Sequence, residues 1–254
     1  MKDIKMNDKS TPDTVTAAML AIGDELLSGR TRDKNIGHLA SALTLQGIDL
    51  KEVRIVSDEQ DDIVAAVNAL RARYDYVFTS GGIGPTHDDI TADAIAKAFN
   101  VAIDHDQRAL KMLSEHYASR DIEFTTARKR MARIPHTADL IPNEVSIAPG
   151  FILGNVYVMA GVPSVFQAML GAILPTLEGG ALMLSASIDC SHGEGTIGDG
   201  LGEIQKQHPN TSIGSYPKFD GKTYSTQIVV RSRDQANVDS AVSDVQIMLD
   251  SLND

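Results

Sequence analysis

A glycine-rich turn that leads into two adjacent aspartates is the part of the sequence best suited to chemistry. The stretch TSGGIGPTHDD, residues 79–89, places three glycines within four positions. Glycine tolerates positive φ and lets a ligand approach the backbone closely. Successive N–H groups at such a turn, followed by a helix, bind anions such as phosphate. The alternative interpretation is a tight strand-to-helix turn without a ligand, in which Thr86 or Asp88 caps the helix.

The phosphate-binding interpretation gives this turn a defined set of ligand residues. Its glycines would supply backbone donors and its hydroxyl side chains would add further ones. The turn is neither a Walker A loop nor a GxGxxG motif, because no Gly-Lys-Ser/Thr follows and the glycine spacing differs. The predicted ligand-binding residues of the turn are Thr79, Ser80, Gly81, Gly82, Gly84 and Thr86.

Carboxylates in two separate loops indicate a divalent cation beside the phosphate. Asp88 and Asp89 end the glycine-rich turn, and Asp24 and Glu25 occur in a second polar loop, residues 23–35. One acid in the first turn of a helix only complements the helix dipole, and four solvated loop acids are the alternative. A cation held between carboxylates and phosphate accounts better for both pairs. We therefore predict Asp88 and Asp89 as catalytic, and Asp24, Glu25 and Asp88 as ligands of Mg²⁺, Mn²⁺ or Co²⁺.

The elements that would position these loops alternate between strand and helix. Apolar runs ending in glycine are typical of buried parallel strands, and strand–helix–strand order implies right-handed crossovers with helices on both faces of a sheet. Ligands of such sheets bind beyond the carboxyl ends of the strands, which is where both loops fall. The expected elements are strands 15–23, 48–56, 74–82 and 156–160 and helices 35–47, 61–73, 89–99, 105–119, 125–133 and 164–177.

A change of pattern after residue 178 predicts a second, smaller domain. Strand, helix, two strands and a final helix follow one another over about 70 residues, enough for a small α+β domain. The last helix carries Val238, Val242, Val245 and Leu249 on one face. The expected organisation is a disordered tail at 1–14, a main α/β domain at 15–178 and the small βαββα domain at 181–254.

Composition and charge narrow the functional classes. The net charge of −11 disfavours a nucleic-acid partner, because phosphate backbones require a basic surface. A single cysteine, Cys190, excludes an internal disulfide framework and indicates a reducing cytoplasm. No apolar run approaches the roughly 20 residues of a membrane span, and the polar N-terminus lacks the apolar region of a signal peptide. We expect a cytoplasmic protein without membrane or nucleic-acid partners.

Two motifs together resemble the molybdopterin-binding MoaB/MogA-like superfamily, and more narrowly its CinA-type branch. The motifs are IGDELLSGRTRDKN and TSGGIGPTHDDITADAIAKAF, and the later APGF and VYVMAGVPSVFQAML match that branch in order. The same domain forms the N-terminal half of eukaryotic FAD synthase. The resemblance covers about residues 15–178, and the tail resembles the KH-like segment that follows in CinA-type proteins. One departure is Ala160, which stands where the family has a proline.

The resemblance carries its own expectations. It implies a three-layer α/β/α sandwich, a homo-oligomer and a small nucleotide or pterin as partner. It also places Asn35 at the asparagine that closes the family's first loop, so Asn35 is predicted to bind the ligand. CinA-type domains are associated with metal-dependent hydrolysis of nucleotide pyrophosphates such as ADP-ribose, and the FAD synthase domain with FAD hydrolysis. No counterpart of the deamidase or transferase domains of those proteins is expected. The alternatives are a molybdopterin-binding or adenylating protein, and a non-catalytic nucleotide- or pterin-binding module.

Overall fold

The computed structural model describes residues 14–219, 221 and 224–252. The predicted disordered tail therefore lies outside the described residues, apart from Thr14. The chain divides between Gly180 and Ala181 into two compact units, each of which has its own hydrophobic core. Among the described residues, no helix has both the length and the apolarity that crossing a bilayer requires.

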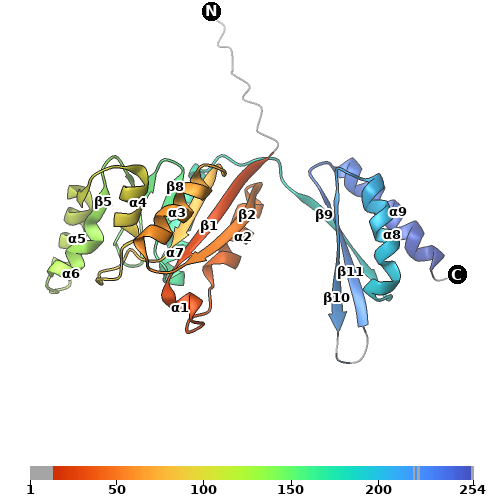
Figure 1. Cartoon of the computed structure of the whole chain (residues 1–254), viewed down its shortest axis with the longest axis horizontal. Helices are drawn as coiled ribbons and strands as arrows, with labels where there is room; N and C mark the ends of the chain where they lie inside the picture. Colours follow the sequence, from red (N-terminus) through yellow and green to blue (C-terminus); the bar gives the residue numbers. More distant parts are fainter. Residues whose placement is uncertain (1–13, 220, 222–223, 253–254) are drawn as a thin grey trace, which may run out of the picture. The chain divides into compact units, whose positions relative to one another are not determined.

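A six-stranded sheet forms the centre of the first unit (Figure 1). Its strand order is β2-β1-β3-β8-β7-β6. The first four strands run parallel to one another, and β7 and β6 extend the sheet in antiparallel fashion. The predicted mostly parallel sheet is confirmed, whereas the antiparallel pair was not expected from the sequence. The strands are β1 (Val15–Ile22), β2 (Ile48–Val56), β3 (Tyr76–Ser80), β6 (Asp139–Ile141), β7 (Gly150–Leu153) and β8 (Val156–Met159).

Helices cover both faces of this sheet and make three layers. The side chains of β1 point alternately to the two faces of the sheet. Leu20 and Ile22 belong to the core on one face, and Ala17 and Met19 belong to the core on the other. Burial on both faces explains why the strand is apolar throughout. Helices α3 (Gln60–Arg71) and α4 (Thr91–Phe99) pack on the first side, and α2 (Asn35–Leu45) and α7 (Pro163–Ile173) on the second.

Local signals set the ends of several helices. Gly47, which was predicted to cap the C-terminus of α2, follows this helix with φ of 71°. Its amide donates to the carbonyl of Thr44, as expected of a capping glycine. Pro163 begins α7 as predicted. The expected helix 125–133 instead breaks into short turns. The remaining elements of the unit are α1 (Asp24–Leu27), β4 (Ile103–His105), α5 (Gln107–Ala118), α6 (Thr126–Lys129), η1 (Arg130–Ala132), β5 (Arg133–Pro135) and η2 (Leu174–Thr176).

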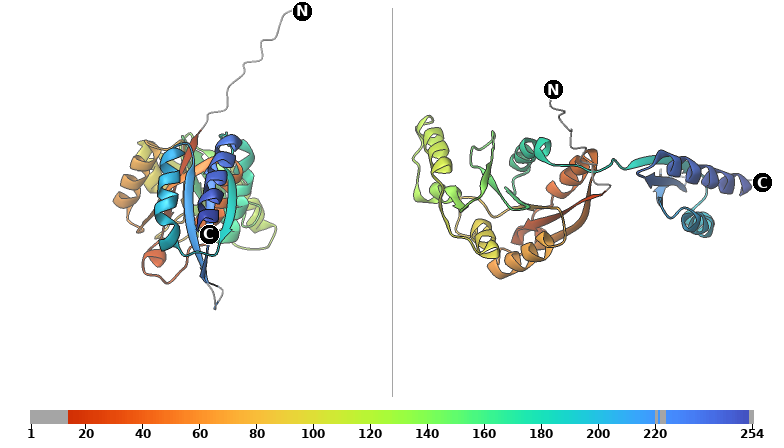
Figure 2. Two further views of the ribbon diagram at one scale, coloured as in Figure 1. Left: turned by 90° about the vertical axis from the view of Figure 1, so that its right-hand side faces the viewer. Right: turned by 90° about the horizontal axis from the view of Figure 1, so that it is seen from above.

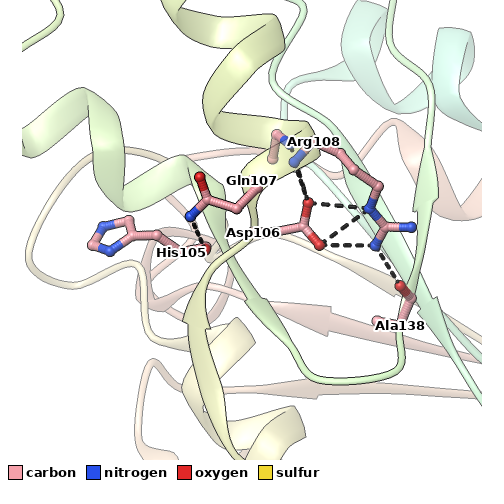
Figure 3. A network of polar contacts seen from close by, with 6 residues as sticks. His105, Asp106, Gln107, Arg108 and Ala138 are labelled. Atoms are coloured by element: carbon pink, nitrogen blue, oxygen red, sulfur yellow. Dashed lines mark hydrogen bonds and ion pairs between the residues drawn. The ribbon is translucent and has the colours of Figure 1, made fainter.

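An aspartate both caps α5 and ties it to the chain that follows β5 (Figure 3). The Asp106 carboxylate accepts hydrogen bonds from the amides of Arg108 and Ala109, at 2.8 and 3.2 Å. The Arg108 side chain returns to the same carboxylate and also donates to the carbonyl of Ala138 at 2.9 Å. The Arg108 side chain and these amides hold the pKa of Asp106 below its ordinary value. The network fixes α5 next to the segment that follows β5.

The second unit has the predicted βαββα order. Its three strands form an antiparallel sheet in the order β10-β11-β9. Both helices lie on the same face of this sheet (Figure 2), where Val238 and Val245 of the last helix pack against Ile228 and Val230. The elements are β9 (Leu184–Cys190), α8 (Glu194–Gln207), β10 (Ser212–Phe219), β11 (Tyr224–Ser232) and α9 (Gln235–Ser251).

Candidate functional site

A cavity of about 590 Å³ opens where the four parallel strands of the first unit end. It is lined by Gly23 after β1, Asp58 after β2, Gly81 after β3 and Gly161 after β8. Parallel strands bring their carboxyl ends to one edge of a sheet, so segments more than a hundred residues apart in the chain meet there. This is the edge at which the sequence places both polar loops.

The glycines of the loop after β3 are required by close packing. Gly81 has φ of 112°, and a Cβ there would lie 2.2 Å from the carbonyl oxygen of Ile22. Gly82 has φ of 68°, and a Cβ there would lie 2.1 Å from the Thr91 hydroxyl oxygen. That hydroxyl donates to the carbonyl of Gly81 at 3.0 Å, and the Thr91 amide donates to the carbonyl of Gly82 at the same distance. The first residue of α4 therefore holds the loop backbone in place.

Three consecutive backbone donors in this loop are free. Gly82, Ile83 and Gly84 line the cavity, and their amides have no acceptor in the described part of the chain. Pro85, which follows them, has no N–H. Free amides at a glycine turn that precedes a helix form a site for an anion. The loop thus has the backbone chemistry that the sequence predicted for phosphate binding.

The two aspartates at the end of the loop differ in their surroundings. One Asp89 carboxylate oxygen accepts the amide and the hydroxyl of Thr86, at 2.8 and 2.5 Å. Because residues 86–89 form this turn, they are not part of the helix, and α4 begins at Thr91 rather than at Asp89 as expected. The Asp88 side chain is 64% exposed, and one of its oxygens lies 3.9 Å from Nδ1 of His87. A hydrogen bond from Thr86 lowers the pKa of the Asp88 carboxyl. Asp88 is thus open to solvent and to a ligand, whereas Asp89 also shapes the loop.

A carboxylate that the sequence analysis missed completes the acidic side of the cavity. Asp58, two residues after β2, lines the cavity with Glu25, Asp88 and Asp89, and accepts the amide of Asp24 at 3.0 Å. Burial raises the pKa of Asp58, and the negative charges of Asp24, Glu25 and Asp88 raise it further. The available signal was its position, because it follows a predicted parallel strand at the same sheet edge as the two loops.

The acidic side fits a cation that is shared with a ligand. In the described part of the chain, no three His, Cys, Asp or Glu side chains are grouped so that they could hold a metal ion by themselves. Mg²⁺ commonly binds one or two carboxylates and completes its coordination with water and substrate phosphates. Glu25 and Asp88 line the same cavity as the free amides, so they can serve such a cation. The predicted ligand Asp24 is exposed and is not part of the lining.

Three predicted ligand residues lie beneath the cavity instead of lining it. Asn35, Thr79 and Ser80 are buried. The Asn35 side chain donates to the Ser80 hydroxyl and to the carbonyl of Gly161, both at 2.8 Å. It thereby joins the loop after β8 to the end of β3. Thr86, the fourth such residue, is exposed and binds Asp89 rather than contributing to the lining.

Part of the cavity lining is apolar. Met131, Val162, Val165 and Met169 contribute to it, and none of them was predicted from the sequence. Ala160, where the resemblance led us to expect a proline, also lines the cavity, and its amide lies 3.5 Å from the sulfur of Met169. A proline could not make that contact, because it has no N–H. The cavity can therefore hold a flat apolar group as well as phosphates.

Replacement of Asp58 by asparagine is expected to stabilise the protein at neutral pH in the absence of divalent ions. The folded state raises the pKa of Asp58, so the folded protein binds this proton more tightly than the unfolded chain, and the ionised carboxylate opposes folding. Its removal should raise the free energy of unfolding by about 0.5–1 kcal/mol at pH 8. The gain should shrink as the pH falls toward the unfolded pKa, about 3.9.

Thermal unfolding of both proteins at pH 5 and pH 8, with and without Mn²⁺, measures this effect. The asparagine can still accept the Asp24 amide, so the loop is preserved. Mn²⁺ should stabilise the wild type more than Asp58→Asn, because it relieves the repulsion that the substitution has already removed. Equal melting temperatures at pH 8 would show that the carboxylates do not repel one another appreciably.

Comparison with known proteins gives matches for both units. The family described as a probable molybdopterin binding domain matches residues 18–179, and the family described as the middle domain of FAD synthase matches residues 182–252. A protein of Pyrobaculum calidifontis is 35% identical over 212 residues, which make up 80% of this chain and 81% of that one.

Two further relatives belong to the CinA group. A CinA-like protein of Desulfosudis oleivorans is 33% identical over 214 residues, which make up 80% of this chain and 52% of that protein. The crystal structure of the protein CinA, of unknown function, from Thermoplasma acidophilum matches with a TM-score of 0.59 and 33% identity, and covers 65% of this chain and 98% of that one. The covered share of this chain, 65%, is close to the length of the first unit alone.

Proposed function

Because this chain belongs to the family of the probable molybdopterin binding domain and is related to the CinA-like proteins within it, we propose that it hydrolyses the pyrophosphate bond of a nucleotide such as ADP-ribose or FAD. One observation carries the proposal. Gly82, Ile83 and Gly84, whose amides are free within the described part of the chain, line the same cavity as Glu25, Asp58 and Asp88. Hydrogen-bond donors for a phosphate next to side chains that can bind a cation are what catalysis at phosphorus requires.

The chain's own residues have separate parts in this reaction. The loop amides bind the phosphoryl oxygens and stabilise negative charge as it develops there. Glu25 and Asp88 would hold a divalent cation, whose chemistry would be to neutralise phosphate charge and make phosphorus more electrophilic. A water oxygen bonds to phosphorus, the bridging P–O bond breaks, and the leaving phosphate keeps that electron pair. Asp58, with its raised pKa, accepts the proton of the water.

The shape of the cavity supports a dinucleotide-like substrate. Its volume of about 590 Å³ lies within the range of about 300–1,000 Å³ that is common for ligand pockets. The apolar wall of Met131, Val162, Val165 and Met169 offers a surface for a base or another flat ring, although no aromatic side chain lines the cavity. We therefore expect weak discrimination between bases and stronger dependence on the diphosphate.

A second candidate function is binding or adenylation of molybdopterin. The description of the matching family favours it, and the same apolar wall would accept a pterin ring. The phosphate loop and the carboxylates would act on the pterin phosphate in the same way. Binding of a nucleotide or pterin without turnover is the remaining alternative.

A hydrolysis screen separates these functions. Purified protein is incubated with ADP-ribose, FAD, NAD or ATP, with Mg²⁺, Mn²⁺, Co²⁺ or a chelator. Metal-dependent release of a nucleoside monophosphate from ADP-ribose or FAD is the expected result. No release from any of them, together with ATP-dependent adenylation of molybdopterin, would move the assignment to the second function. Tight nucleotide binding without either reaction would show a binding module.

A further inference from the structure

A second hollow of the first unit carries positive charge. It has a volume of about 380 Å³, and it shares none of its lining residues with the large cavity. We propose that this hollow binds a phosphate group, either inorganic phosphate or a terminal phosphomonoester. Three of its lining residues, Asp93, Arg130 and Arg133, also line a narrow gap together with the glycine loop, residues 82–84. The lining residues are Gln60, Ile90, Asp93, Arg130 and Arg133.

Two guanidinium groups share a single carboxylate in this hollow. Arg133 forms a hydrogen-bonded ion pair with one oxygen of Asp93, and Arg130 Nη2 lies 3.9 Å from the other oxygen. Both arginine side chains are about 30% exposed, at 31% for Arg130 and 28% for Arg133. The three side chains leave one net positive charge at the surface of a chain whose overall charge is −11. A small anion is the ligand that such a group attracts.

Arg133 also has a donor that the protein leaves unused. Its Nε–H is buried and has no acceptor among the described residues. A buried donor without a partner costs about 1–3 kcal/mol. An acceptor that reached Nε–H after a small movement of the side chain would recover part of this free energy. The planar fork of arginine presents Nε–H and Nη–H in the geometry that matches two oxygens of a phosphate. This unused donor favours phosphate over a halide, which offers only one acceptor atom.

The start of α3 lies at the hollow. Gln60, the first residue of this 12-residue helix, is one of the lining residues, so the positive end of the helix dipole is near. Asp61, which follows, is paired with Lys97 at 2.7 Å. Glu59 and Asp62 add two further negative charges at this helix end and weaken its attraction for an anion. The anion preference therefore depends on the two arginines.

Arg130 connects this hollow with the glycine loop. Its Nε and Nη2 donate to the carbonyl of Asp89, at 3.3 and 3.1 Å. The side chain of Asp89 lines the large cavity. Asp89 thus belongs to the lining of the large cavity and also accepts hydrogen bonds from Arg130 of the hollow. A phosphate in the hollow would therefore lie close to the glycine loop.

Phosphate titration followed by NMR tests the site without any assay of hydrolysis. Inorganic phosphate is added to the ¹⁵N-labelled full chain at low ionic strength, without divalent ions. Saturable shifts of the Arg133 Nε–H and the Gln60 amide are expected. If only the amides of residues 82–84 respond, phosphate binds in the large cavity and the proposal is wrong.

Matched variants test which charges matter. Arg133→Gln and Arg130→Gln should each raise the dissociation constant for phosphate about tenfold or more, by loss of a charge-assisted hydrogen bond. Lys129→Gln removes an equal charge from a neighbouring side chain outside the hollow and should change it less than about twofold. Arg133→Lys keeps the charge near Asp93 but not the fork, so it should fold and still bind weakly. An equal loss in Lys129→Gln, or none in either arginine variant, would overturn the proposal.

Discussion

Replacement of Asp88 by asparagine is expected to lower the rate of pyrophosphate hydrolysis about 100-fold or more while the fold survives. Asp88 lines the cavity and its side chain is largely exposed, and asparagine keeps an oxygen that can accept the hydrogen bond from Thr86, which lowers the pKa of this carboxyl. Its loss removes a cation ligand and a negative charge next to the phosphate, and errors of positioning at such a centre commonly cost this much in rate. Initial rates with ADP-ribose at saturating Mn²⁺ give the comparison.

Two controls make this result interpretable. Asp199→Asn removes the same charge from an exposed position of α8 in the second unit and should leave the rate unchanged. Circular dichroism and the melting temperature show whether Asp88→Asn folds normally. A variant with normal folding and an unchanged rate would exclude Asp88 from the chemistry, even if the protein hydrolyses the substrate.

The largest effect on stability is expected from Gly81→Ala. The added Cβ would lie 2.2 Å from the carbonyl oxygen of Ile22, which is part of β1 and cannot move aside as a side chain could. The positive φ of 112° adds backbone strain. Strain and overpacking together should cost about 3 kcal/mol, or about 6–12 °C in the melting temperature of a domain of this size.

Gly29→Ala separates the two causes. Gly29 also has a positive φ, of 72°, but nothing lies within 4 Å of the position of a Cβ. This variant should lose only about 1–2 kcal/mol, the cost of the left-handed conformation. Urea unfolding of both variants gives the difference. If Gly81→Ala is no less stable than Gly29→Ala, the close contact between the loop and β1 does not constrain the protein.

The helices and strands could largely be predicted, because their signals are local. Apolar runs of the length of a strand, helical spacing of apolar residues, Gly47 after one helix and Pro163 at the start of another all lie within a few residues of what they determine. The short antiparallel strands β6 and β7 escaped prediction. Each has only three or four residues and is stabilised by its neighbours in the sheet rather than by its own pattern.

The candidate site could be predicted only in part. The glycine loop is apparent in the sequence because positive φ and close approach demand glycine at Gly81 and Gly82. The roles of the polar side chains were harder to predict from the sequence. Thr79 and Ser80 adjoin the loop in sequence, yet the end of β3 buries their side chains beneath the cavity. Asp58 was overlooked, because nothing within its own segment distinguishes it from a solvated acid.

The sequence by itself thus determined the parallel sheet, the edge where ligands would bind and the glycine loop that offers backbone donors. Tertiary structure decided which acids share a cavity, which hydroxyls turn inward and that two arginines from a single short segment meet Asp93 beside a second hollow. The physical reason is the range of the interactions. Backbone conformation depends on neighbouring residues, whereas burial, charge repulsion and shared ligands depend on segments that only the sheet brings together.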